Sequence, residues 1–92
     1  MDKISTKERI DEALRMVSEL SRKDPEDKAA RVVAEQLEYL KEIYARDGNL
    51  KSIPRGKMTI GVIAAREYDT ANPKLAELLY EISWVLDHGD QG

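Results

Sequence analysis

Hydrophobic residues recur every three or four positions along most of this chain, which is the spacing of amphipathic α-helices. In residues 5–22, the segment Ser5-Thr6-Lys7-Glu8 has the form of a capping box, and an apolar stripe follows it: Ile10, Ala13, Leu14, Val17 and Leu20. In residues 25–47, Asp24-Pro25 supplies an N-cap followed by proline, and Gly48 a C-terminal stop. The stripe there is Ala30, Val33, Leu37, Leu40 and Tyr44. Together the two segments predict an antiparallel helical hairpin.

Two further helices are predicted after a loop at 49–56, which Pro54 helps to keep out of a helix. Met58 to Ile63 alone also suit a short buried strand. We predict a helix over 57–68, because an isolated strand would leave its backbone groups unpaired. Asn72-Pro73 then begins a fourth helix, 73–88, with the stripe Leu75, Leu78, Leu79, Ile82, Val85 and Leu86. The expected fold is all-α, a compact bundle of about four helices in a single domain, 1–92.

The third predicted helix is apolar nearly all round. One stripe consists of Met58, Gly61, Val62, Ala65 and Tyr68, and another of Ile60, Ile63 and Ala64. Such a helix is either the central element, surrounded by the other three, or a helix with one face left for a partner. We favour the central position, in which Gly61 lets a neighbouring helix approach closely.

The charge and the cysteine content argue against several kinds of binding site and partner. The chain has 92 residues, no cysteine, 15 basic and 18 acidic residues, and a net charge of −3. It therefore forms no disulfide or thiolate metal site, and the charge argues against nucleic acid or an anionic membrane as the main partner. Because the N-terminus lacks the apolar region of a signal peptide, and no apolar run approaches membrane length, we expect a cytoplasmic protein.

The sequence contains few candidate catalytic residues. There is one histidine and no glycine-rich phosphate loop, and the helical carboxylate pairs, such as Glu38 with Glu42, lie among Lys and Arg on solvated faces. We therefore predict no catalytic, cofactor-binding or metal site, and expect the chain not to be an enzyme. His88 is expected at the surface at a helix C-terminus. Trp84 is either half-buried against the first hairpin or an exposed anchor.

The segments Ala34–Leu40, Met58–Asp69 and Asn72–Leu75 resemble small bacterial immunity proteins that protect against a type VI secretion effector which degrades NAD(P)⁺. The resemblance implies an all-helical antitoxin that needs no cofactor and covers the active site of its cognate toxin in the cytoplasm. The N-terminal helix and the basic loop at 54–56 depart from the family. The toxin's reaction therefore stays open between NAD(P)⁺ hydrolysis, ADP-ribosylation and nucleotide pyrophosphorylation.

The expected contact region is the second helix with the turn between the third and fourth. Acidic residues of the second helix, or Glu77 and Glu81 of the fourth, would mimic an anionic substrate. Arg and Tyr are favoured in interface hot spots. The predicted partner-binding residues are Glu35, Glu38, Tyr39, Glu42, Arg66, Glu67, Tyr68 and Asp69. The alternative is a non-enzymatic adaptor that forms a homodimer through the third helix.

Overall fold

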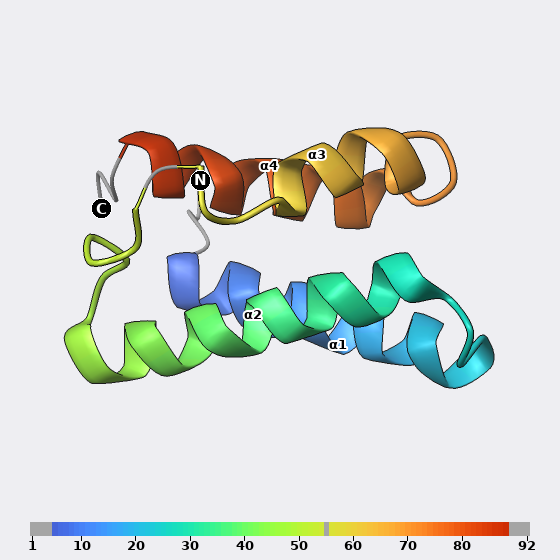
Figure 1. The fold of residues 1–92 in the computed structure, drawn as a ribbon, viewed down its shortest axis with the longest axis horizontal. Helices are drawn as coiled ribbons and strands as arrows, with labels where there is room; N and C mark the ends of the chain where they lie inside the picture. Colours follow the sequence, from blue (N-terminus) through green and yellow to red (C-terminus); the bar gives the residue numbers. More distant parts are fainter. Residues whose placement is uncertain (1–4, 55, 89–92) are drawn as a thin grey trace.

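The computed structural model describes residues 5–54 and 56–88, and all the regular structure in this part is helical. Helices α1 (Thr6–Lys23) and α2 (Lys28–Asp47) form one antiparallel layer. A second layer, which lies above the first in Figure 1, contains α3 (Ile60–Ile63), its π-helical continuation η1 (Ala64–Tyr68) and α4 (Pro73–His88). The predicted all-α bundle is confirmed.

Local sequence signals set several helix ends. The Glu8 N–H donates to the Ser5 hydroxyl at 3.1 Å, and the Ser5 N–H donates to the Glu8 carboxylate at 3.3 Å, so the predicted capping box begins α1. Gly48 ends α2 in the left-handed conformation, with φ of 74°, which glycine adopts without the steric cost of a Cβ. The Asn72 side chain accepts the Leu75 N–H at 3.4 Å at the start of α4.

The predicted start of α2 is wrong by three residues. Asp24 ends α1, since its N–H donates to the Leu20 carbonyl at 2.9 Å. The Asp24 carboxylate accepts the Glu26 N–H at 3.2 Å, and this closes a turn around Pro25. Asp27 is the N-cap instead, and its side chain accepts the Ala30 N–H at 3.1 Å. Because Asp24 already ends one helix, it is not available to begin the next.

The core lies between the two layers and is filled by the predicted stripes. Fully buried side chains come from α1, α2, α3 and α4 alike, the largest apolar ones being Ile10, Val17, Val33, Leu37, Leu40, Ile60, Leu75, Leu79 and Ile82. Burying each such side chain contributes about 1.5–3 kcal/mol. Packing of these faces therefore stabilises a domain that has no cross-link.

The third helix is not the central element, so the position we favoured from sequence is wrong. It begins at Ile60, not 57, and lies beside α4 in the second layer (Figure 1). Ile60, Ala64 and Tyr68 point into the core, whereas Val62 is 59% exposed. The close approach assigned to Gly61 is present, because a Cβ added there would lie 2.7 Å from the Ser83 hydroxyl oxygen. Of the two apolar sides of this helix, one therefore covers the core, and the other is exposed at the surface.

Candidate protein-interaction surface

The outer side of α2 carries an exposed acidic and aromatic stripe. Glu35, Tyr39 and Glu42 are exposed at positions i, i+4 and i+7, which share one face of a helix. Val32 continues this face toward the start of α2 with 40% of its surface exposed. Glu38 is also exposed, but it lies further round the helix. We call Val32, Glu35, Tyr39 and Glu42 the α2 stripe.

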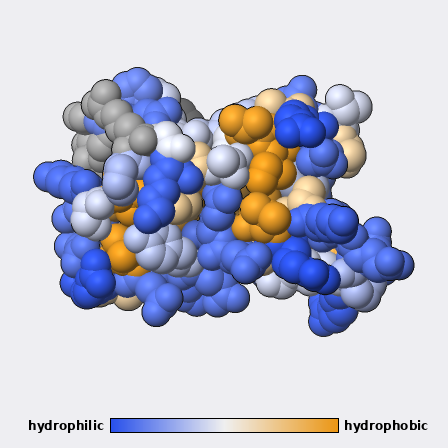
Figure 2. Space-filling view, viewed as in Figure 1, coloured by the Kyte–Doolittle hydropathy of each residue, from blue (hydrophilic) through white to orange (hydrophobic). Residues whose placement is uncertain are grey.

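Apolar surface links this stripe to the second layer. Figure 2 shows an apolar strip that crosses the face of the molecule from α3 down to α2. Exposed or partly exposed apolar side chains of these helices include Val62 and Ile63 on α3 and Val32 and Ala34 on α2. Exposed apolar surface with a polar rim is typical of protein-binding faces. The strip therefore joins two elements that are distant in sequence into one candidate surface.

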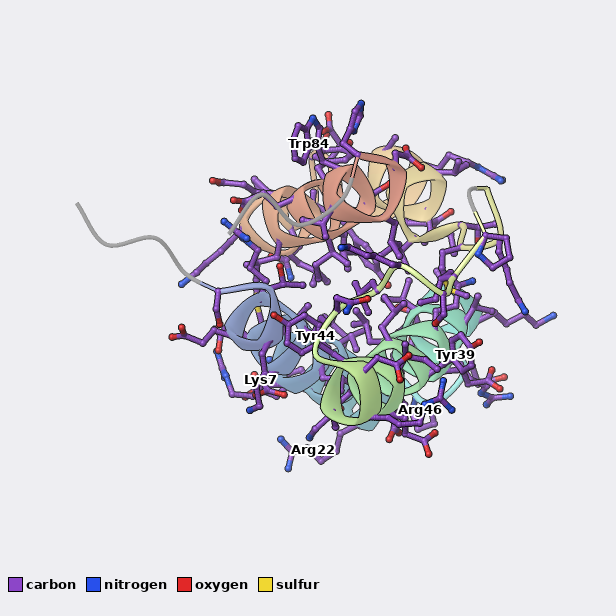
Figure 3. All side chains as sticks on the ribbon, turned by 90° about the vertical axis from the view of Figure 1, so that its left-hand side faces the viewer. Lys7, Arg22, Tyr39, Tyr44, Arg46 and Trp84 are labelled. Carbon is purple, nitrogen blue, oxygen red and sulfur yellow. The ribbon has the colours of Figure 1, made fainter. Side chains whose placement is uncertain are left out.

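Tyr39 and Trp84 mark different sides of the molecule. In Figure 3, Tyr39 lies on the side that α2 shares with α3, whereas Trp84 points away from the first layer at the outer surface of α4. The Lys57 ammonium lies 5.7 Å from the centre of the Tyr39 ring, within the range of a cation–π interaction. Trp84 is 50% exposed and stacks on His88 with 4.5 Å between ring centres. The exposed alternative for Trp84 and the surface position of His88 are confirmed.

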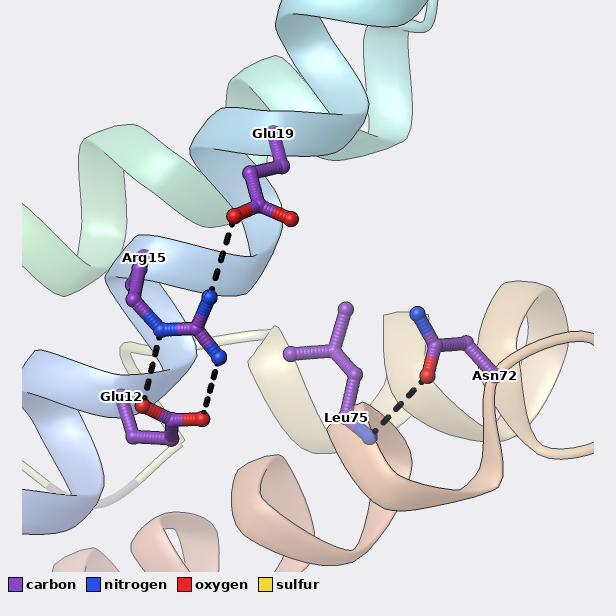
Figure 4. A network of polar contacts seen from close by, with 5 residues as sticks. All are labelled: Glu12, Arg15, Glu19, Asn72 and Leu75. Atoms are coloured by element: carbon purple, nitrogen blue, oxygen red, sulfur yellow. Dashed lines mark hydrogen bonds and ion pairs between the residues drawn. The ribbon is translucent and has the colours of Figure 1, made fainter.

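The carboxylates of α2 differ in their pairing from those of α1. Arg15 is bound by Glu12 at 2.6 Å and by Glu19 at 3.0 Å (Figure 4), and hydrogen bonding to Arg15 lowers the pKa of Glu12. Glu81 on α4 pairs with Arg9 at 3.2 Å. None of the ion pairs in residues 5–54 and 56–88 involves Glu35, Glu38 or Glu42. With respect to this part of the chain, the three carboxylates are available to cationic groups of a partner.

The predicted contact residues of the turn between η1 and α4 lie at one end of the molecule, near the start of α2. Arg66, Glu67 and Asp69 are exposed. Asp69 accepts the hydroxyl of Tyr80 at 2.9 Å, which ties the turn to α4. Desolvation of the ring, together with this bond and the charge of Asp69, raises the pKa of Tyr80. The structure thus places these residues beyond the N-terminal end of the α2 stripe, not beside Glu42.

Tyr68 is not a surface residue. Its side chain is only 5% exposed and packs in the core. Burial, with smaller contributions from the charges of Asp27 and Glu67, raises its pKa to about 12. Its hydroxyl finds no hydrogen-bond partner among the described residues. We therefore leave Tyr68 out of the candidate surface, although sequence analysis placed it there.

The described residues contain neither a metal-binding group nor a membrane-spanning helix. Within residues 5–54 and 56–88, no group of three or more His, Asp or Glu side chains is arranged to hold a metal ion. None of the helices in this part combines the length and apolarity required to cross a membrane.

Sequence reasoning missed three contributors to this surface. Val32 had a visible signal, because it is apolar but lies outside the stripe of Ala30, Val33 and Leu37. Lys57 had no such signal in the sequence, because the position of its ammonium over the Tyr39 ring depends on the path of the loop before α3. The same holds for Gln36, whose side chain binds Thr59 from 23 positions away in sequence.

The chain is thus a small all-helical domain with an exposed acidic, aromatic and partly apolar face, which is its candidate interaction surface. The model of the Tsi6 family matches residues 5–88. The chain therefore belongs to the Tsi6 family, the type VI secretion immunity proteins that its sequence resembles.

A solved structure of Tsi6 from Pseudomonas aeruginosa is similar in fold, with a TM-score of 0.73 and 27% sequence identity. The similarity covers 89% of this chain and 84% of that one. A comparison with curated proteins gives no match.

Proposed function

We propose that this chain is an immunity protein that binds a cognate type VI secretion toxin in the cytoplasm and occludes its active site. The toxin is an enzyme that degrades NAD(P)⁺ or acts on a related nucleotide. Membership of the Tsi6 family supports the general role. The observation that supports the mechanism is the group of three exposed carboxylates around Tyr39 on α2, Glu35, Glu38 and Glu42, which form no ion pair with another described residue.

The mechanism is electrostatic and steric. An enzyme that binds a phosphate-bearing substrate uses cationic side chains to hold it, and carboxylates form charge-assisted hydrogen bonds with the same groups. Complementary charge also accelerates the encounter of two proteins. The α2 stripe would face those cations, while Tyr39 and the apolar strip supply contact area in an interface of roughly 1,600 Å² in total. No catalytic group or cofactor is required from the immunity protein.

The general role is tested by co-expression with the product of the adjacent open reading frame. We expect that product to arrest growth alone, and this chain to relieve the arrest and co-purify with the toxin. Persistent arrest, together with no complex in a pull-down, would contradict the proposed function.

The α2 surface is tested by reversing its charge. Glu35→Lys with Glu42→Lys would place two cations opposite the toxin's cations, and like charges in an interface cost several kcal/mol. We expect at least a tenfold weaker Kd, since 1.4 kcal/mol corresponds to a factor of ten.

The matched control is Glu77→Lys, which reverses an exposed carboxylate on α4. It should leave the Kd near the wild-type value. If Glu77→Lys weakens binding and the α2 substitutions do not, the contact surface lies on α4 and our assignment is wrong.

Homodimerisation remains the second candidate function, and the exposure of Val62 and Ala65 on the outer side of α3 and η1 favours it. Sedimentation of the purified chain separates the two roles. A stable dimer that Val62→Glu dissociates, with no toxin partner, would favour the adaptor function.

A further inference from the structure

The side chain of Gln36 joins α2 to the beginning of α3 through a pair of hydrogen bonds. Its amide nitrogen donates to the Thr59 hydroxyl at 2.8 Å, and its carbonyl oxygen accepts the Thr59 N–H at 3.0 Å. Thr59 is the N-cap of α3, yet its own side chain makes no capping hydrogen bond to that helix. The Thr59 hydroxyl therefore serves the contact with α2, not the local helix end.

The start of α3 is held on one side by its packing against α4, where Gly61 lies close to Ser83, and on the other by the Gln36–Thr59 pair. The helix has four residues before it continues into η1, and the described residues that precede it, 49–54 and 56–59, contain turns but no regular helix. Ile60 buries its side chain at the start, and Tyr68 buries its ring at the far end of η1. Isolated helices of this length are unstable in water, so tertiary contacts must fix it.

We infer that Gln36 is a positioning residue, which keeps α3 in register with α2 so that the apolar strip and the α2 stripe form one face before the toxin binds. This inference rests on the proposed function. Gln36 occupies the position next to Glu35 and three before Tyr39, on the side of α2 nearest Thr59. Losing the pair would leave every exposed residue of the face present but the two halves free to move. A face that must be ordered on binding binds more weakly than one already in place.

The free protein provides the first readout. In Gln36→Ala both hydrogen bonds to Thr59 are lost. We expect about tenfold faster hydrogen exchange at the Ile63 and Ala64 amides, whose acceptors include the Thr59 and Ile60 carbonyls. Exchange in α1 should be unchanged, and circular dichroism should show that the variant remains folded.

A conservative variant separates positioning from general loss of packing. In Gln36→Glu the carboxylate still accepts the Thr59 N–H, and it also accepts the Thr59 hydroxyl once that group rotates to donate. We expect Gln36→Glu to restore slow exchange at Ile63 and Ala64. Thr59→Val removes only the hydroxyl bond and should give an intermediate rate. Unchanged exchange in Gln36→Ala, or equally fast exchange in Gln36→Glu, would overturn the inference.

Binding to the co-expressed toxin domain provides the second readout. Gln36→Ala should raise the dissociation rate about tenfold, and Gln36→Glu should return it toward the wild-type value. Ser18→Ala, an exposed position on α1, serves as the control. If the wild-type protein does not bind the toxin, the proposed function fails and this inference with it. If the wild-type protein binds and Gln36→Ala dissociates at the wild-type rate, only the positioning role is wrong.

Discussion

The contact between Gly61 and Ser83 sets how closely α3 approaches α4, and Gly61→Ala tests it directly. A Cβ at position 61 would lie 2.7 Å from the Ser83 hydroxyl oxygen and 3.1 Å from the Ser83 Cβ. Rotation of the Ser83 side chain relieves the first contact only at the cost of its preferred rotamer, and the second requires the two helices to move apart. In contrast to most glycine-to-alanine changes within helices, this one should therefore be destabilising.

The expected magnitude is the difference of two opposing effects. Replacing glycine by alanine inside a helix normally stabilises by about 0.5–1 kcal/mol, whereas overpacking a well-packed contact costs about 1–3 kcal/mol. We expect the free energy of unfolding to fall by about 1 kcal/mol. For a domain of this size that corresponds to a decrease in Tm of roughly 4–8 °C.

Urea denaturation of a double-mutant cycle with Ser83→Ala is the appropriate measurement. Removing the Ser83 hydroxyl relieves the closer contact, so the double variant should be more stable than the sum of the two single changes predicts, by about 0.5–1 kcal/mol. An increase in stability for Gly61→Ala alone, by the amount expected from helix propensity, would show that Gly61 does not face Ser83. That result would refute the described packing of α3 on α4.

Two further substitutions, one of them followed as a function of pH, test the core and the beginning of α1. Tyr68→Phe removes a buried hydroxyl that has no partner among the described residues, so thermal denaturation should show a stability gain of about 1 kcal/mol; a loss would mean that the hydroxyl is bonded. Because folding raises the pKa of Tyr68 from 10.0 to about 12, its ionisation favours the unfolded chain. The stability that Tyr68 contributes is complete below pH 10 and lost as the pH rises through 12, so the advantage of Tyr68→Phe over the wild type should widen over that interval in urea melts and stay constant below it. Ser5→Ala removes the oxygen that accepts the Glu8 N–H, and calorimetry should show a loss of about 1 kcal/mol; a neutral effect would mean that this end of α1 is frayed.

Much of the fold follows from the sequence because the responsible interactions are local. The capping box at Ser5, the left-handed Gly48 and the cap at Asn72 each involve residues within four positions of one another. The helical stripes likewise predicted which side of α1, α2 and α4 is buried. The exposure of Glu35, Glu38 and Glu42 followed from their positions outside the row of buried apolar residues on α2.

The tertiary structure decided what depends on residues far apart in the chain. Periodicity gave α3 two apolar sides but not which of them covers the core, since that depends on where α4 and α2 pack. The preference for Tyr in interface hot spots placed Tyr68 among the contact residues, although the path of η1 turns this ring inward. The pair of hydrogen bonds between Gln36 and Thr59 likewise exists only once α2 and the start of α3 are brought together. Hydrogen bonds and charge pairs act over a few ångströms of space, so a linear pattern determines them only where the partners are also neighbours in sequence.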